Sequence, residues 1–347
     1  MYHHVGKSLN VGPRSPVLVP DKLRVSLGSA VVLGLVQGRL DAEPTTVYLL
    51  TYRQGKCFAN CGFCPQARGS GGRGDMLSRV TWPPFPTGEV ITRIGEAFKE
   101  GKIRRVCIQA LNYPTVFEDL LSLIGRIRSQ GNGVPISVCC QPVDRTRIEK
   151  LRSAGIDRIG IPLDAATEVL FDRVKGRSAG GPYVWEDQLQ VLRDAVQVFG
   201  RGSVTTHLIV GLGESEKEMV QRLQWCVDAG IYPSLFSFTP IRGTALEGLP
   251  QPSLGQYRRI QMARHLIVHQ GARYEGMKFD EKDRLVDFDV LGDELNRIVR
   301  GGVPFLTSGC PGCNRPYYNE RPGGPLYNFP RQPLPAEILE IEKEMGL

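Results

Sequence analysis

The chain has 347 residues, of which 41% are hydrophobic and 23% are charged, and it carries a formal net charge of +7 at pH 7. This composition is typical of a soluble globular protein with one large domain or two small ones. No apolar run of about eighteen residues occurs and the first residues lack a signal-peptide layout, which excludes a membrane-spanning helix and predicts a cytoplasmic protein. The basic excess modestly favours an acidic partner, and it fits a generally basic enzyme equally well.

The chain contains nine cysteines. An odd number in a chain without a secretion signal favours metal ligands and buried thiols over disulfides. We therefore expect a reducing compartment, which would also suit an oxygen-sensitive metal site.

The first 44 residues are expected to precede the main domain. Residues 1–20 are rich in glycine and proline and predict an irregular arm, whereas residues 21–40 carry apolar side chains at helical spacing and predict one or two helices. A strand is predicted at residues 45–52. The loop of residues 56–66, which holds three cysteines, follows its carboxyl end directly.

Helices and strands alternate through the rest of the chain. The predicted helices cover residues 88–100, 116–130, 145–154, 167–174, 184–199, 216–229, 254–270 and 289–300. The predicted strands cover residues 105–111, 135–141, 158–164, 203–211, 234–240 and 304–308, with a weaker strand near Met277 or Leu285. This alternation predicts a parallel sheet in an α/β fold.

Because residues 304–308 supply a closing strand, we expect a complete or nearly complete TIM-type (β/α)8 barrel rather than an open six-stranded form. The barrel would span residues 45–309, between an amino-terminal extension of residues 1–44 and a cysteine-containing tail of residues 310–347. Reactive groups of such barrels lie at the carboxyl ends of the strands, where the three-cysteine loop is predicted.

The three cysteines of this loop, Cys57, Cys61 and Cys64, have the spacing C-x3-C-x2-C. Three thiolates can hold three irons of a 4Fe–4S cube and leave the fourth iron open. A structural zinc site is the alternative, but zinc loops usually contain two C-x2-C pairs or add histidine. No histidine lies between His4 and His207.

With Phe63 just before its last cysteine, this motif resembles that of the radical S-adenosylmethionine (SAM) enzymes. In that family SAM chelates the open iron, and one electron cleaves it to a 5′-deoxyadenosyl radical that removes hydrogen from unactivated carbon. The resemblance implies a 4Fe–4S cluster with SAM and an electron donor such as ferredoxin. The protein would supply a dry, closed pocket.

Two further stretches fit the resemblance. The strand at 203–211 runs into Gly211 and Gly213, similar to the glycine motif that lies against the adenine of SAM, although a tight turn would also use glycine there. Asp164 ends the fourth strand, and Arg177 follows it. In the biotin synthase branch such residues bond the ribose hydroxyls and the carboxylate of SAM; the alternatives are a helix N-cap and a solvated arginine.

The resemblance to biotin synthase runs from about residue 46 to residue 246 and reaches Cys107 and Cys139. In biotin synthase, cysteines at such places hold a 2Fe–2S cluster that donates sulfur. Strand alternation points Cys139 into the barrel and Cys140 outward. The sequence departs from the family at Thr205, where a further cysteine is expected.

A second cysteine motif, Cys310-x2-Cys313, follows the last predicted strand. If the barrel closes, this pair lies beside the first strand at the same mouth as the three-cysteine loop. We therefore infer a second, auxiliary iron–sulfur cluster held by Cys310 and Cys313, with Cys107 and Cys139 completing its ligands. A redox-inert or zinc-binding pair is the alternative.

Together with residues 317–330, this motif resembles the two-component lipoyl synthases of archaea and some anaerobes. In those enzymes two biotin-synthase-like subunits act on an octanoyl chain carried by a protein lysine. The resemblance implies sulfur insertion into unactivated C–H bonds, a second radical SAM subunit and an octanoylated carrier, either a lipoyl domain or a glycine cleavage H protein. The apolar substrate chain would need a hydrophobic pocket between the two clusters.

Other functions remain open from the sequence. A small-molecule enzyme resembling biotin synthase or methylornithine synthase would share the barrel and the first cluster. A methylthiolating enzyme acting on tRNA would use the basic surface, but the chain shows no appended nucleic-acid-binding module, so a nucleic-acid partner is not expected. A non-catalytic iron–sulfur or zinc protein is the remaining class.

Overall fold

The computed structural model describes residues 20–130, 133–141, 143–321 and 323–346. Most of the predicted irregular arm, at residues 1–19, lies outside the described residues. The main sheet has eight strands in the order β10-β9-β8-β7-β6-β2-β1-β5. Its parallel strands are β2 (Thr46–Leu50), β6 (Arg105–Gln109), β7 (Ile136–Cys139), β8 (Arg158–Gly160), β9 (Val204–Val210) and β10 (Ile231–Ser237).

Two antiparallel strands extend the edge of this sheet. β1 (Lys22–Val25) pairs with β2, and β5 (Pro84–Pro86) pairs with β1. The prediction of helices across residues 21–40 is therefore wrong in part. This range begins with strand β1, and only α1 (Leu27–Val32) within it is helical. In β1, Leu23 and Val25 are buried and Arg24 is not, which is the two-residue period of a strand.

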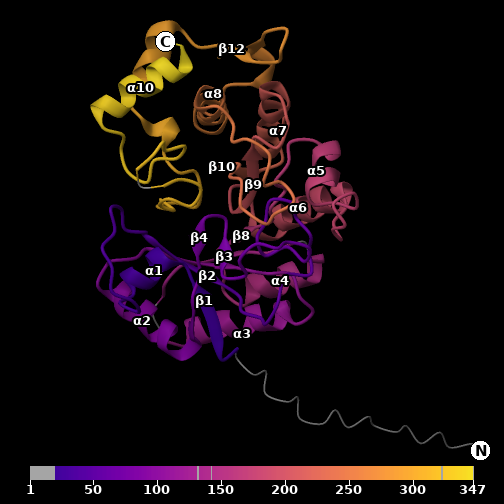
Figure 1. The fold of residues 1–347 in the computed structure, drawn as a ribbon, viewed down its shortest axis with the longest axis vertical. Coiled ribbons are helices and arrows are strands. Elements are labelled where there is room, and N and C mark those ends of the chain that lie inside the picture. The colour runs from indigo at the N-terminus through magenta and orange to yellow at the C-terminus, as the bar shows by residue number, and fades with distance from the viewer. Residues whose placement is uncertain (1–19, 131–132, 142, 322, 347) are drawn as a thin grey trace, which may run out of the picture.

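Helices cross over between the parallel strands and cover the outside of the sheet (Figure 1). They are α2 (Thr87–Lys99), α3 (Val116–Ser129), α4 (Arg145–Ser153), α5 (Glu168–Val174), α6 (Trp185–Phe199) and α7 (Glu216–Asp228), followed by α8 (Leu254–His265) with a π-helical end (Leu266–Gln270). Helix α3 shows why they form. It buries one stripe at three- and four-residue spacing, made of Phe117, Leu120, Leu123, Ile124 and Ile127.

The parallel sheet is not the complete eight-stranded barrel that the sequence predicts. The predicted closing strand at residues 304–308 instead begins in a 3-10 helix, Val303–Phe305, and Leu306 makes a single bridge to Phe329. Pro304 has no N–H to donate to a ladder, which disfavours a strand there. The weak strand predicted near Met277 or Leu285 forms a separate hairpin, β11 (Lys278–Phe279) with β12 (Leu285–Asp287).

The gap between β10 and β2 is bridged by residues 307–315, which we call the plug segment. The Leu235 N–H of β10 donates to Ser308 Oγ at 2.8 Å, and the Thr45 N–H beside β2 donates to Asn314 Oδ1 at 3.0 Å. Side-chain hydrogen bonds therefore join the two edges where a backbone ladder was expected.

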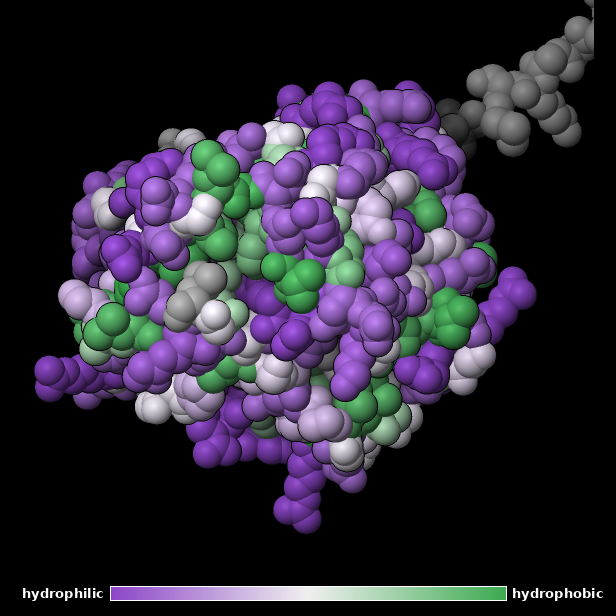
Figure 2. All heavy atoms as spheres, turned by 90° about the horizontal axis from the view of Figure 1, so that it is seen from above, coloured by the Kyte–Doolittle hydropathy of each residue, from purple (hydrophilic) through white to green (hydrophobic). Residues whose placement is uncertain are grey.

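The remaining short elements lie near the termini and the cysteine loop. They are the hairpin of β3 (Met76–Leu77) with β4 (Val80–Thr81), a 3-10 turn (Tyr274–Gly276), α9 (Gly292–Arg300) and α10 (Pro335–Met345). Helix α10 packs on α8 (Figure 1). Among the described residues, no helix combines the length and the apolar character needed to cross a membrane. Figure 2 shows a mainly hydrophilic face with scattered hydrophobic residues and no broad apolar patch.

Candidate active site

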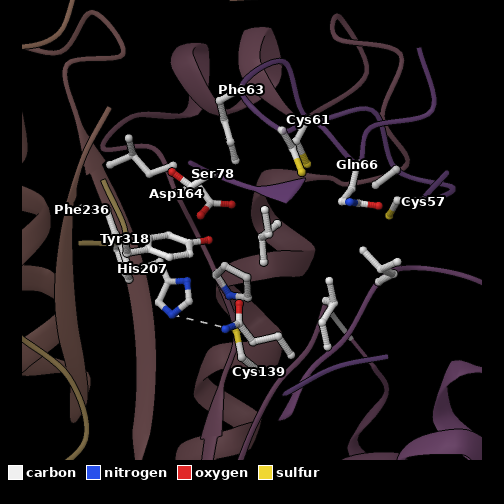
Figure 3. Close-up of a pocket in the computed structure, with 18 of the residues that line it drawn as sticks. Cys57, Cys61, Phe63, Gln66, Ser78, Cys139, Asp164, His207, Phe236 and Tyr318 are labelled. Atoms are coloured by element: carbon white, nitrogen blue, oxygen red, sulfur yellow. Dashed lines mark hydrogen bonds between the residues drawn. The ribbon is translucent and has the colours of Figure 1, made fainter. Parts of the chain in front are cut away.

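Two cavities lie one above the other along the inside of the strands. The upper cavity, of about 160 Å³, is lined by residues at the carboxyl ends of the strands together with all three cysteines of the loop (Figure 3). The lower cavity, of about 40 Å³, is lined by residues nearer the amino ends, such as Thr46, Arg105 and Arg158. The strands β2, β6, β7, β9 and β10 contribute residues to both cavities, whereas β8 lines only the lower one.

Backbone hydrogen bonds shape the cysteine loop. The Cys57 N–H donates to Gln66 O at 2.9 Å, and the Cys64 N–H donates to Cys61 O at 3.0 Å. The Gln66 amide donates to the carbonyls of Gly74 and Met76, at 2.7 and 2.6 Å. Cys57 Sγ accepts the backbone N–H of Asn112 at 3.1 Å, which aims this sulfur at the cavity wall.

The three thiols suit an iron–sulfur cube. Burial raises the pKa of Cys64 to about 12, and burial raises the pKa of Cys61 further, so both sulfurs are neutral thiols until a cation joins them. Nearby thiols raise both values, which places the three sulfurs within range of one another's charge. Among the described residues, no group of three metal-binding side chains is placed to hold a single metal ion. A cube does not need such a group, because each of its irons takes only one thiolate.

Asp164 lies in the upper cavity near Phe63 (Figure 3). Its Oδ2 accepts from Lys175 Nζ at 2.7 Å, and the same ammonium donates to Pro162 O at 2.7 Å. Lys175 is fully buried, so this pair is shielded from water. The helix N-cap that follows is Thr167, which removes the N-cap alternative for Asp164.

The structure does not bring Arg177 to the cavity. Its side chain is exposed, and its backbone N–H donates to Asp172 Oδ1 at 2.8 Å. Helix α5 ends at Val174 and the next residue, Lys175, turns back onto Asp164, so the cation beside this carboxylate is the lysine.

Gly211 and Gly213 follow β9 with φ values of 101° and 120°, which favour glycine. A Cβ on Gly211 would lie 2.7 Å from Pro252 Cδ. The Glu214 carboxylate accepts the Gly211 N–H and so tightens this turn. Neither glycine lines the upper cavity, whereas Ile209 on the same strand does.

The lower cavity gathers the four remaining predicted ligands, Cys107, Cys139, Cys310 and Cys313. Burial, together with the neighbouring thiols Cys107 and Cys313, raises the pKa of Cys310 to about 12. The hydroxyl of Tyr48 lies 3.1 Å from Cys313 Sγ. The sequence therefore predicted which thiols meet, although they come from three separate parts of the chain.

The predicted position of this second group is wrong. Cys310 and Cys313 do not reach the mouth that holds the three-cysteine loop, because the closing strand that would carry them there does not form. The plug segment instead inserts them at the amino ends of the strands, within the barrel. Cys139 points inward, as alternation predicts, whereas Cys140 also reaches the upper cavity because β7 ends at Cys139.

Four residues line both cavities and form the wall between them: Cys139, His207, Phe236 and Arg315. Cys139 Sγ and His207 Nε2 are 3.9 Å apart (Figure 3), and the His207 ring packs on Phe236 with centroids 4.8 Å apart. Burial, together with the charges of Arg315 and Lys175, lowers the pKa of His207 to about 3, which favours the neutral imidazole.

Arg315 reaches the wall from the plug segment. Its guanidinium lies 4.0 Å from the Tyr318 ring centroid and 5.0 Å from that of Tyr48. Its Nε is buried without a hydrogen-bond partner in the described part of the chain. A buried cation with an unused donor beside four thiols fits an anionic group in the lower cavity.

Sequence analysis missed His207, Lys175 and Arg315. The alternation along β9 was a usable signal for His207, since Thr205, His207 and Ile209 share the inward face. Lys175 and Arg315 had no comparable signal, because each reaches its position from outside a strand.

The comparisons with known proteins agree with this site. A family model described as the radical SAM superfamily matches residues 51–226, just over half of the chain. A biotin synthase from Acinetobacter calcoaceticus is 25% identical over 230 residues, covering 65% of this chain and 66% of that protein. One from Delftia acidovorans is 27% identical over 226 residues, covering 62% and 59%. The matched region thus spans less than two thirds of either relative.

A solved structure shares the fold. The FeFe-hydrogenase maturase from Carboxydothermus hydrogenoformans has a TM-score of 0.51 at 16% identity, over 69% of this chain and 54% of that one. At this identity the likeness concerns the fold alone. The family match spans the three-cysteine loop and the strands β6 to β9, and the chain belongs to the radical SAM superfamily, whose members use a 4Fe–4S cluster with SAM.

Proposed function

We propose that this protein inserts sulfur into unactivated C–H bonds of a protein-bound octanoyl chain, as one subunit of a lipoyl synthase. An auxiliary iron–sulfur cluster in the lower cavity would donate the sulfur. The observation that carries the proposal is the wall shared by the two cavities, since it puts four thiols directly behind the SAM site.

The upper cavity has the residues that SAM chemistry needs. Cys57, Cys61 and Cys64 would hold three irons of the cube, which with SAM supplies a 5′-deoxyadenosyl radical when bound. Asp164 presents its second carboxylate oxygen to the cavity and would accept the ribose hydroxyls. Lys175 donates to the other oxygen and so fixes the orientation of this buried carboxylate.

The lower cavity has residues that fit a sulfide-bearing cluster. Cys107, Cys139, Cys310 and Cys313 would be its thiolate ligands, and Arg315 would offset part of its negative charge. Such a group, when bound, supplies bridging sulfide. Residues 310–347 would then act as an auxiliary-cluster segment attached to the barrel of residues 45–309.

The space between the two groups suits an aliphatic chain. Apolar side chains of Leu50, Leu111, Ile209 and Phe238 line the upper cavity and exclude water from a reacting carbon. Tyr318, from the tail, also lines it, so the tail closes one side of the space that an alkyl chain would enter.

The proposed partners follow from this substrate. A second radical SAM subunit would carry out the other insertion, and a lipoyl domain or glycine cleavage H protein would deliver the octanoyl chain. The net charge of +7 suits an acidic carrier surface. An electron donor such as ferredoxin would serve the first cluster in the cytoplasm.

A small-molecule substrate is the second candidate. The relatives that match over most of the barrel are named biotin synthase, which favours sulfur insertion into a compact metabolite. A rearrangement like that of methylornithine synthase would need the first cluster alone and would leave the lower cavity without a role.

The deciding experiment is mass spectrometry of an octanoylated carrier peptide. Anaerobically reconstituted protein is incubated with SAM, a strong reductant and the peptide, with and without the presumed partner subunit. A gain of one sulfur per peptide supports the proposal, and a Cys310→Ala protein should give none. Formation of 5′-deoxyadenosine without sulfur gain in either mixture would contradict it, as would iron contents of about four per chain, the content of one cube.

A further inference from the structure

We propose that His207 is a ligand of the auxiliary cluster and binds, through Nε2, the same iron as Cys139. This inference rests on the proposed function, because it presumes a cluster in the lower cavity. It replaces one of the four expected thiolates with a nitrogen donor: in a 2Fe–2S cluster, where each iron takes two protein ligands, Cys139 and His207 would hold one iron and two of the other three thiols the second.

The distance between the two donors carries the first step. His207 Nε2 lies 3.9 Å from Cys139 Sγ (Figure 3). A tetrahedral metal with a thiolate at about 2.3 Å and an imidazole nitrogen at about 2.1 Å holds these donors about 3.6 Å apart. A shift of a few tenths of an ångström therefore suffices for both to bind one iron.

The strand pairing carries the second step. Cys139 ends β7 and His207 lies within β9, on either side of β8, whose Gly160 pairs with Cys139 and with Thr205. A Cβ at Gly160 would lie 3.5 Å from Cys139 Sγ and 3.0 Å from Thr205 Oγ1. The glycine therefore keeps the space beside Cys139 Sγ free of a side chain.

Two contacts orient the imidazole ring of His207. Phe236 packs against one side of the ring. Among the described residues, Cys139 is the one side chain with which His207 makes a hydrogen-bond contact. Imidazole nitrogen is a common metal ligand in proteins, and this one faces a thiol that lines the same cavity. No other side chain of the described residues forms a hydrogen bond with His207 Nε2.

The remaining thiols fall into a separate group. Cys107, Cys310 and Cys313 line the lower cavity alone, whereas Cys139 lines both cavities. His207 is the one other metal-binding side chain of the described residues that lines both cavities, beside Cys139. The iron nearest the upper cavity would carry one thiolate and one neutral nitrogen, which raises a cluster's reduction potential.

The test isolates the auxiliary cluster. A Cys57→Ala/Cys61→Ala/Cys64→Ala protein, labelled with 15N-histidine and reconstituted anaerobically, is reduced and studied by pulsed EPR beside the unlabelled protein. We expect a strongly coupled nitrogen whose frequencies change with the label and vanish in His207→Asn. The matched control, His269→Asn, alters an exposed histidine at the end of the π-helical turn and should keep the signal.

The outcomes separate this inference from the proposed function. Iron and sulfide present in the triple variant without a label-sensitive nitrogen would overturn the inference and leave the auxiliary cluster standing. Absence of iron from the triple variant would overturn both. If His207→Asn fails to fold, His207→Cys provides the second measurement: it should keep the iron, lose the nitrogen coupling and shift the reduction potential to more negative values, and an unchanged potential would contradict histidine ligation.

Discussion

The two cavities of the barrel are built in opposite ways. The upper one takes its three thiols from a single short loop held by its own backbone hydrogen bonds, as in Cys57 N–H to Gln66 O. The lower one takes its thiols from β6, β7 and the plug segment, so it exists only when the carboxyl-terminal region docks on β2. Local sequence thus specifies the first site, and tertiary structure specifies the second.

The largest expected effect breaks the upper site. Cys61→Ala removes one of three thiolates from the loop, and formation of 5′-deoxyadenosine should fall roughly a thousandfold or more, because residues that act as a unit lose their activity together. The measurement is chromatography of 5′-deoxyadenosine under strong reductant. Cys226→Ala, which removes a buried thiol on α7 outside the cavities, should retain the activity. Equal losses in both variants would contradict the assignment.

The second prediction breaks the lower site alone. Cys310→Ala should abolish sulfur gain on the substrate while 5′-deoxyadenosine forms at a rate within roughly twofold of wild type, since Cys310 lines the lower cavity alone and its loss leaves the three-cysteine loop intact. Both products are measured in one reaction. Loss of both 5′-deoxyadenosine formation and sulfur gain would show that the two cavities are coupled through the wall. That result would contradict the view that the two sites are built independently.

The same contrast explains what the sequence could predict. Cys57, Cys61 and Cys64 were identified because their spacing lies within one loop, and the inward direction of Cys139 followed from strand alternation. The location of Cys310 and Cys313 could not be predicted, because it depends on side-chain bonds such as that between Thr45 and Asn314, which join opposite ends of the chain. The six parallel strands were predicted in order, but the closing strand predicted at residues 304–308 does not form.

The third prediction concerns the buried pair behind the SAM site. Lys175→Met leaves the Asp164 carboxylate buried without its cation, which should lower the free energy of unfolding by about 3–5 kcal/mol. Arg177→Ala, which removes an exposed cation two residues away, should change it by less than about 0.5 kcal/mol. Denaturant unfolding of the reconstituted proteins measures both.

The matching rescue sharpens this test. Lys175→Met/Asp164→Asn removes the unpaired charge as well and should recover part of the lost stability, while SAM binding stays weak because the carboxylate is gone. If Arg177→Ala proved the more damaging change, the arginine would hold a role that its exposed position does not explain.

The smallest effect is expected where the plug segment meets β2. Asn314 accepts the Thr45 N–H at 3.0 Å and donates from its amide to Glu43 O at 2.8 Å, so Asn314→Ala removes two hydrogen bonds at the edge of the barrel. The bond with Thr45 is partly buried and the bond with Glu43 is exposed. A typical hydrogen bond contributes about 0.5–1.5 kcal/mol, so the free energy that docks the plug segment should decrease by an amount of this order. Iron bound by the lower cavity should therefore decrease while the cube stays loaded, which iron analysis in a Cys57→Ala/Cys61→Ala/Cys64→Ala background measures directly. Loss of iron from the three-cysteine loop of Asn314→Ala would contradict this expectation, because the upper site would then depend on docking of the plug segment.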